Sequence, residues 1–321
     1  MSDPEIKGLL ERVRAGDVGS LVVLAKRVLV GEGIKQAPPD AIAMLEMAVK
    51  QGAPEAALQL SVCAAWGVGL PRNPQKAIEY LVMAAGFGST VAKRELALLG
   101  CASDGAHAQA KQPVDLSALT TAHGVRIVSE RPRILVVERF ATEAECAWLI
   151  ERGRPALTRA LVYRGSADAQ VAQTRTNTEM GFTIFHADVL LSLLRDRMAA
   201  VLQTSTRFFE VTKLLHYEPG EQFALHGDFL QTNTPELAQE VDLRGQRSTT
   251  FLVYLNDGFE GGETDFPRLG FRYKGNRGDA LVFSNLQADG SPDYSTVHAG
   301  LATTRGEKWL LSQWVRTKPV G

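Results

Sequence analysis

Two histidine-x-aspartate tripeptides are the first residues in this sequence that could bind a metal ion. One is His186-Ala187-Asp188 and the other is His226-Gly227-Asp228. A histidine and a carboxylate two residues apart can share one ion when they lie on the same face of a strand. The first tripeptide opens a helical pattern, where aspartate is a preferred N-cap, so we expect Asp188 to be a cap. The second tripeptide is therefore the candidate metal site.

His226 and Asp228 lie in a segment with the character of a β-strand. Side chains alternate between the two faces of a strand, which predicts His226 and Asp228 on one face and Phe223 on the other. A second histidine from another strand would complete two histidines and one carboxylate, the facial set of non-haem Fe(II) oxygenases. His298, in a later strand-like segment, is the candidate, and Lys308 follows it by ten residues.

A domain of mixed helices and short strands, beginning at Pro132, must position these residues. A capping box at residues 142–145 and apolar residues at helical spacing over 188–203 predict two helices. Runs rich in β-branched residues predict strands at residues 133–138, 211–217, 222–228, 249–255, 280–283, 294–301 and 308–315. Many short strands after a pair of supporting helices predict an α+β jelly roll, a double-stranded β-helix, with no long helix after Val211.

From about residue 132 to residue 316 the sequence resembles a prolyl 4-hydroxylase-like dioxygenase that depends on Fe(II) and 2-oxoglutarate. The matching motifs follow one another in the family's order along nearly the whole domain. They are Tyr217-Glu-Pro-Gly220 with His226-x-Asp228, Gly245-Gln-Arg247, Thr250-Phe-Leu-Val-Tyr-Leu-Asn256, Glu260-Gly-Gly-Glu-Thr264, Gly278-Asp-Ala-Leu281, and Val297-His298-Ala-Gly300 with Gly306-x-Lys308-Trp309 and Trp314.

The resemblance implies a role for each residue that matches a motif. The residues expected to bind Fe(II) are His226, Asp228 and His298. Lys308 would pair with the distal carboxylate of 2-oxoglutarate, a charge-assisted contact, and these four residues are the expected catalytic set. The other residues expected at the cosubstrate are Tyr217 and Thr250, through their hydroxyl groups, and Trp314, packed beside the iron ligands.

Two positions near the expected substrate pocket depart from the family pattern. The family often has an Arg-x-Ser motif where this sequence has Arg175-Thr176-Asn177, and Phe223 replaces an aromatic hydroxyl. Both changes leave the iron and cosubstrate residues intact. Arg175 and Arg247 are the candidate substrate contacts.

The resemblance also implies the reaction and its cofactors. Fe(II) is the metal, 2-oxoglutarate and O2 are cosubstrates, succinate and CO2 are products, and ascorbate is the expected reductant. The metal and cosubstrate carry the oxidative chemistry, while the protein supplies geometry and excludes water.

The N-terminal third of the sequence repeats every 36 residues. Gly16, Gly52 and Gly88 mark the period, and a shift of 36 also superposes small and apolar residues such as Leu24 on Leu60. Each unit is predicted to be two short helices, with the third unit ending after its first helix. The units resemble Sel-one-like repeats, relatives of the tetratricopeptide fold. Such stacks expose binding surfaces, so they either dock a protein substrate or only cap the next domain.

Length and composition limit the number of domains, the kind of partner and the cell compartment that we expect. The 321 residues suggest two domains, 45% hydrophobic and 22% charged residues are typical of a globular protein, and a net charge of −1 argues against a nucleic-acid partner. The start of the chain has no apolar signal segment and no run is long enough to span a membrane, which together with three scattered cysteines favours the cytoplasm. We expect helical repeats over residues 1–102, a linker over 103–131 and the dioxygenase domain over 132–321.

The leading hypothesis is a dioxygenase that hydroxylates a side chain, with prolyl 4-hydroxylation expected, in a protein or peptide held in part by the repeats. One alternative keeps the chemistry but acts on a free amino acid or small metabolite. A second alternative is a repeat-based adaptor whose oxygenase domain is silent.

Overall fold

The computed structural model describes residues 4–101, 114–161 and 174–320. The chain forms two compact units. The first contains residues 1–119 together with 187–193, and the second contains residues 120–186 and 194–321. None of the described helices is long and apolar enough to cross a lipid bilayer.

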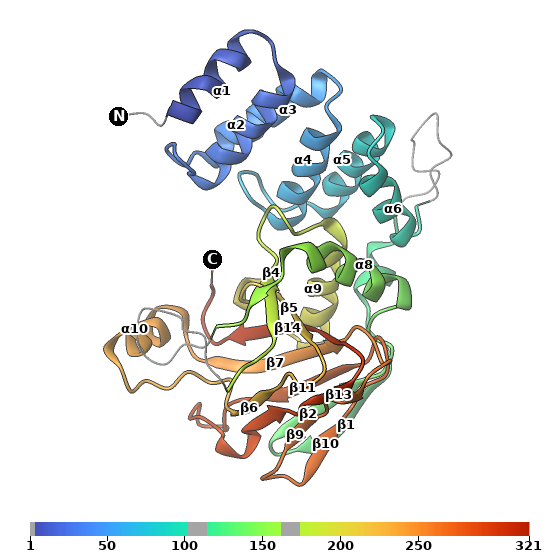
Figure 1. Ribbon diagram of the computed structural model, residues 1–321, viewed down its shortest axis with the longest axis vertical. Coiled ribbons are helices and arrows are strands. Elements are labelled where there is room, and N and C mark those ends of the chain that lie inside the picture. Colours follow the sequence, from blue (N-terminus) through green and yellow to red (C-terminus); the bar gives the residue numbers. More distant parts are fainter. Residues whose placement is uncertain (1–3, 102–113, 162–173, 321) are drawn as a thin grey trace. The chain divides into compact units, whose positions relative to one another are not determined.

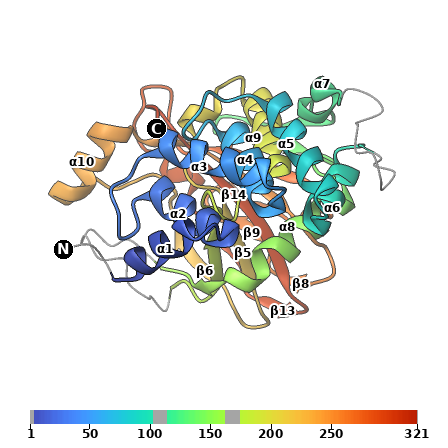
Figure 2. The same cartoon turned by 90° about the horizontal axis from the view of Figure 1, so that it is seen from above.

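The first unit is an array of helices built on the 36-residue period (Figure 1). Its helices are α1 Pro4–Arg14, α2 Val18–Val30, α3 Pro38–Lys50, α4 Pro54–Trp66, α5 Pro74–Gly86 and α6 Thr90–Leu98. Helices α2, α4 and α6 begin 36 residues apart, as do α3 and α5, which confirms the predicted helical repeats. Figure 2 shows the helices following one another from α1 to α6. Helix α1 was not predicted, because the repeat pattern begins after it.

Small residues set how closely the repeat helices pack. Ala41, Ala48 and Ala77 are completely buried, so neighbouring backbones approach one another. Gly69 turns the chain after α4 with a φ of +76°, and a Cβ there would lie 2.8 Å from the Pro38 carbonyl oxygen. Only glycine fits such a turn without strain, which explains the Gly-x-Gly pattern between paired helices.

The first turn of α9 (Val189–Leu202) belongs to the same compact unit as the repeats. The Asp188 carboxylate accepts a hydrogen bond from the Leu191 amide at 2.7 Å, which confirms that Asp188 is an N-cap. The buried Glu95 carboxylate of α6 accepts from the amides of Val189 and Leu190 at 2.8 and 3.0 Å. Two carboxylates therefore satisfy amides at this helix start that have no partner within the helix.

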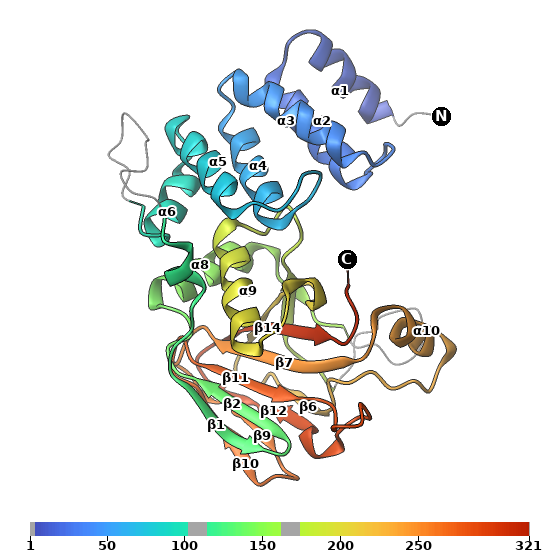
Figure 3. The ribbon, with the colours of Figure 1, turned by 180° about the vertical axis from the view of Figure 1, so that it is seen from behind.

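The second unit contains two antiparallel sheets. The larger has the order β1 (Val125–Glu130), β2 (Arg133–Val137), β11 (Ala280–Ser284), β7 (Arg247–Tyr254), β14 (Lys308–Arg316), β5 (Lys213–Tyr217), β4 (Thr178–Gly181) and β3 (Thr158–Arg159). The smaller has the order β10 (Phe271–Tyr273), β9 (Thr264–Phe266), β12 (His298–Gly300) and β6 (Phe223–His226). A two-stranded ribbon joins β8 (Glu260–Gly261) to β13 (Thr303–Arg305). Figure 3 shows the larger sheet from β1 to β14.

An apolar core fills the space between the two sheets. Phe266 of the smaller sheet meets Phe283 of the larger one edge to face, with ring centroids 5.0 Å apart. Helix α8 (Glu143–Gly153) packs on the outer face of the larger sheet and begins at the predicted capping box of Thr142 and Glu145. The two facing sheets and their supporting helices confirm the predicted double-stranded β-helix.

Several elements differ from those expected. The segment expected as a linker contains α7 (Leu116–Thr120) and β1, because β1 pairs along its length with β2. Its residues 103–113 lie outside the described residues. Helix α10 (Pro235–Arg244) follows Val211, where no long helix was expected. The segment 294–301 forms the short 3-10 helix η3 (Tyr294–Thr296) before β12.

Candidate metal centre

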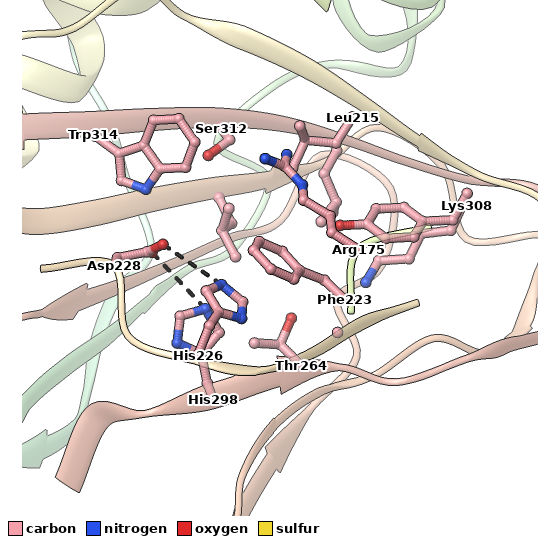
Figure 4. A pocket seen from close by; sticks show the side chains of 14 residues that line it. Arg175, Leu215, Phe223, His226, Asp228, Thr264, His298, Lys308, Ser312 and Trp314 are labelled. Atoms are coloured by element: carbon pink, nitrogen blue, oxygen red, sulfur yellow. Dashed lines mark ion pairs between the residues drawn. The ribbon is translucent and has the colours of Figure 1, made fainter. Parts of the chain in front are cut away.

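His226, Asp228 and His298 converge between the two sheets (Figure 4). Strands β6 and β12 pair so that His298 lies opposite His226, and Asp228 follows two residues after the end of β6. The Nε2 atoms of His226 and His298 lie 3.6 and 3.8 Å from the two carboxylate oxygens of Asp228. In the described part of the chain this is the one group of three such side chains that could hold an ion.

The hydrogen bonds of the two histidines suit a metal ion. The Nδ1 atom of His226 lies 2.8 Å from the Ala224 carbonyl oxygen, and that of His298 lies 3.1 Å from the Thr296 carbonyl oxygen. A carbonyl only accepts hydrogen bonds, so each Nδ1 carries a proton and each Nε2 is the ring atom left to face Asp228 and to bind an ion. Burial also lowers the pKa of His298 to about 4. The donor set therefore fits a divalent cation.

Asp228 is held as a carboxylate by its neighbours. Burial by itself would raise its pKa, but the adjacent His226 and His298 and the Thr250 hydroxyl together lower the pKa below the usual range. Thr250 donates a hydrogen bond to Asp228 Oδ2 at 2.6 Å and accepts one from Asn285 at 2.9 Å. The single hydroxyl proton of Thr250 thus goes to Asp228, and a contact between Thr250 and the cosubstrate, which the resemblance implies, stays a prediction.

Lys308 lies in the same cavity as the three candidate ligands. Its side chain is 1% exposed, and its ammonium donates to the Gly262 carbonyl oxygen at 2.6 Å. Burial lowers the pKa of Lys308 to about 7, and the Glu263 carboxylate offsets only part of that effect. Tyr217 lies opposite Lys308 on the neighbouring strand β5, with the ammonium 5.0 Å from its ring. Burial raises the pKa of Tyr217 to about 12, so its hydroxyl remains a donor.

The alternation of β14 places four of its side chains in the cavity. Lys308, Leu310, Ser312 and Trp314 line it, as alternation along a strand requires, while Trp309 lies on the other face and stacks on His216. The Trp314 Nε1 and Ser312 Oγ atoms are buried, and no hydrogen-bond partner for either is present among the described residues. Buried polar atoms of this kind need partners, so this wall of the cavity suits a polar ligand.

Phe223 lies on the same side of β6 as His226, which corrects the predicted alternation. The two rings are stacked with centroids 3.4 Å apart. The reason is a β-bulge, because His226 and Phe223, three residues apart, pair with His298 and Gly300, only two residues apart. The extra residue reverses the alternation, and Leu225 is left 55% exposed.

Both arginines expected to contact the substrate are bound to protein carboxylates. Arg175 donates to Glu179 at 2.5 Å, and Arg247 donates to both oxygens of Glu210 at 2.7 and 2.8 Å. Arg175 lines the cavity, but it is buried. Arg247 lies over the Trp314 ring at 4.2 Å.

Sequence reasoning overlooked several residues of the site. Thr264 and Leu252 line the cavity, and Asn285 supports Thr250. Asn285 follows β11 and gives no signal in the sequence.

Comparisons with known proteins agree with this geometry. The family model described as the 2OG-Fe(II) oxygenase superfamily matches residues 212–316. Prolyl 4-hydroxylase 1 of Arabidopsis thaliana is 30% identical over 210 residues, which cover 60% of this chain and 71% of that protein. Probable prolyl 4-hydroxylase 10 of the same plant is 30% identical over 214 residues, with coverages of 60% and 71%.

Two solved structures are each similar to a part of the chain. The viral collagen prolyl hydroxylase of Paramecium Bursaria Chlorella virus-1 is 23% identical and covers 57% of this chain and 94% of its own, with a TM-score of 0.44. A Sel1 repeat protein from Oxalobacter formigenes is 31% identical and covers 28% of this chain and 26% of its own, with a TM-score of 0.26. With its prolyl 4-hydroxylase relatives, this chain belongs to the 2OG-Fe(II) oxygenase superfamily of 2-oxoglutarate-dependent dioxygenases.

Proposed function

We propose that this dioxygenase hydroxylates a prolyl side chain at C4 in a protein or peptide substrate. One observation carries the chemistry: the cavity that brings together His226, Asp228 and His298 also contains the buried Lys308. The prolyl substrate is supported by the similarity to proteins named prolyl 4-hydroxylases.

Three residues would hold Fe(II) in this proposal: His226, Asp228 and His298. When bound, Fe(II) supplies the oxidative chemistry by which 2-oxoglutarate and O2 yield succinate and CO2 while the substrate gains a hydroxyl group. The carbonyl contacts of both histidines hold their Nδ1 atoms as donors, leave their Nε2 atoms to bind the ion and fix the ring orientations. Thr250 would orient Asp228 in the same way.

Lys308 would bind the distal carboxylate of 2-oxoglutarate. A buried ammonium stabilises an anion more strongly than an exposed one, because the low dielectric of its surroundings strengthens the attraction. Tyr217 would donate a second hydrogen bond, since its hydroxyl stays protonated. Trp314 and Ser312 offer the buried polar atoms that a polar ligand would satisfy. Burial of these side chains would keep water away from the reacting groups.

Two further parts of the proposal concern the reductant and the repeats. We propose ascorbate as the reductant that restores iron oxidised in turnovers without substrate. We also propose that the helical repeats hold part of the protein substrate, because stacked helix pairs present extended binding surfaces.

The first experiment adds Fe(II) and 2-oxoglutarate to the protein without O2. A visible metal-to-ligand charge-transfer band, followed by succinate when O2 is admitted, is the expected result. If no band and no succinate form, the enzyme proposal is wrong. Substrates trapped from a lysate and analysed by mass spectrometry should carry a +16 Da change on proline, and a change on another residue would contradict the prolyl proposal.

A further inference from the structure

Phe223 lies between a buried arginine and one of the candidate metal ligands. Its ring is stacked on the His226 imidazole with the two planes 11° apart. The Arg175 guanidinium carbon lies 4.7 Å from the centre of the Phe223 ring. Figure 4 shows Arg175, Phe223 and His226 in this succession at the cavity. The orientation of His226 therefore depends on packing as well as on its hydrogen bond to Ala224.

Arg175 is fixed at all three of its guanidinium nitrogens. Nε donates to Asn177 at 3.1 Å, one terminal nitrogen donates to the Leu161 carbonyl oxygen at 3.1 Å, and the other donates to Glu179 at 2.5 Å. These contacts hold the guanidinium group in place while its carbon lies over the Phe223 ring. Arg175 thus supports the aromatic ring from the side opposite His226.

Glu179 is the charged partner that makes this burial possible. Arg175 is 4% exposed and Glu179 is 9% exposed, and a buried guanidinium without a carboxylate would be strongly unfavourable. The second oxygen of Glu179 pairs with Lys213 at 2.5 Å. Glu179 lies on β4 and Lys213 on β5, so the carboxylate is held from the sheet.

We propose that Glu179 is a positioning residue, which through Arg175 holds Phe223 flat against His226 and so orients this metal ligand. The inference rests on the proposed iron site. Groups that orient a ligand from outside the coordination sphere commonly change metal affinity by tenfold or more. Phe223 and Arg175 then act on the metal site through packing, without a hydrogen bond to it.

The test measures Co²⁺ binding to the metal-free full-length protein by calorimetry, because Co²⁺ suits the same nitrogen and oxygen ligands and needs no exclusion of O2. Phe223→Leu and Glu179→Gln should each weaken binding about tenfold, while Phe223→Tyr, which keeps the ring, should bind within about twofold of the original protein. The double variant should bind no more weakly than Phe223→Leu alone, since Glu179 would act only through that ring.

Lys213→Gln is the matched control. It breaks the other ion pair of the same carboxylate but leaves Arg175 in place, so its Co²⁺ affinity should stay within about twofold of the original. If Glu179→Gln does not fold, a variant that carries both Glu179→Gln and Arg175→Gln removes the two charges of the pair together. That variant then takes the place of Glu179→Gln in the comparison with Phe223→Leu. Additive losses, or Phe223→Leu binding as tightly as the original, would overturn the positioning role. A lack of Co²⁺ binding by the unaltered protein would instead overturn the metal site itself.

Discussion

Lys308 is an ammonium group in a cavity that water hardly reaches. Burial lowers its pKa to about 7, so near neutral pH the metal-free protein is a mixture of charged and neutral Lys308. A bound dicarboxylate would favour the charged form and raise that pKa again. Binding of 2-oxoglutarate should therefore be linked to a proton.

The affinity for 2-oxoglutarate is expected to fall as pH rises above 7. Below that pH Lys308 is already charged, while above it a proton must be taken up on binding, which costs up to about tenfold in affinity per pH unit. Calorimetry of the Fe(II)-loaded protein without O2, in buffers of different ionisation enthalpy, should show proton uptake at pH 8. Lys308→Arg keeps its charge over this range and should lose the linkage. Equal affinity at pH 6.5 and 8.5 for the original protein would contradict the pairing.

The two histidine-x-aspartate tripeptides can be told apart by substitution. His226→Ala removes a candidate ligand and should reduce succinate release by about a hundredfold or more. His186 is exposed, and its Nδ1 atom contacts the Thr183 hydroxyl at 2.9 Å, so His186→Ala should leave succinate release within about twofold of the original. The reverse outcome would assign the metal to the other tripeptide.

Which residues meet at the site was only partly predictable. The types and spacing of His226, Asp228 and His298 were sufficient to propose a metal set, because two strands bring such residues together. The position of Phe223 was not predictable, because a β-bulge changes the face on which a side chain lies and has no signal in this sequence. The hydrogen bond from Thr250 to Asp228 was not predictable either, because it depends on how close β7 lies to the segment that follows β6.

At the scale of elements, helix starts were more predictable than short strands. A cap is a local signal, and the capping box at Thr142 was found from four residues. Strands of two or three residues, such as β8 and β12, are defined by their partners and carry little local pattern. Helix α10 has no buried residues, so it lacks the apolar stripe by which a helix is predicted from sequence.

The cap of α9 should contribute more to stability than an exposed cap. Asp188→Ala leaves the Leu191 amide without its partner in a buried place, which should cost about 2 kcal/mol or more. Asn73 caps α5 where water can replace it, so Asn73→Ala should cost about 1 kcal/mol or less. Urea unfolding of the two variants measures the difference. An equal loss of unfolding free energy in both variants would show that burial of the α9 start does not strengthen the contribution of its cap.

At the scale of the whole molecule, the two compact units are interleaved along the chain. Residues 187–193 belong to the compact unit of the helical repeats, although in the sequence they follow the first strands of the catalytic unit. Glu95 of α6 and Trp66 of α4 both bond to the start of α9. Removing residues 1–100 would thus take away partners of α9 as well as any docking surface, so a truncation cannot separate docking from stability.

Docking by the repeats is better tested on their surface. A groove formed by the start of α2 and the segment before α4 is lined by Val18, Val22, Val23, Lys26 and Glu55, and Val23 is 45% exposed. If a protein substrate binds there, Val23→Glu with Lys26→Glu should raise KM for that protein about tenfold by placing charges in an apolar contact. KM for a short prolyl peptide that lacks any segment bound by the groove should not change.

Met83→Glu is the control for that experiment. Met83 is 40% exposed on α5 and does not line the groove, so this variant adds a surface charge to the same unit without altering the groove. It should leave KM for both substrates unchanged, because an isolated surface charge has little effect on folding. Since the groove variant changes only exposed or half-buried side chains, it leaves the cap of α9 intact. An unchanged KM for the protein substrate in the groove variant would mean that this groove does not take part in docking, and that the repeats act here as a structural cap.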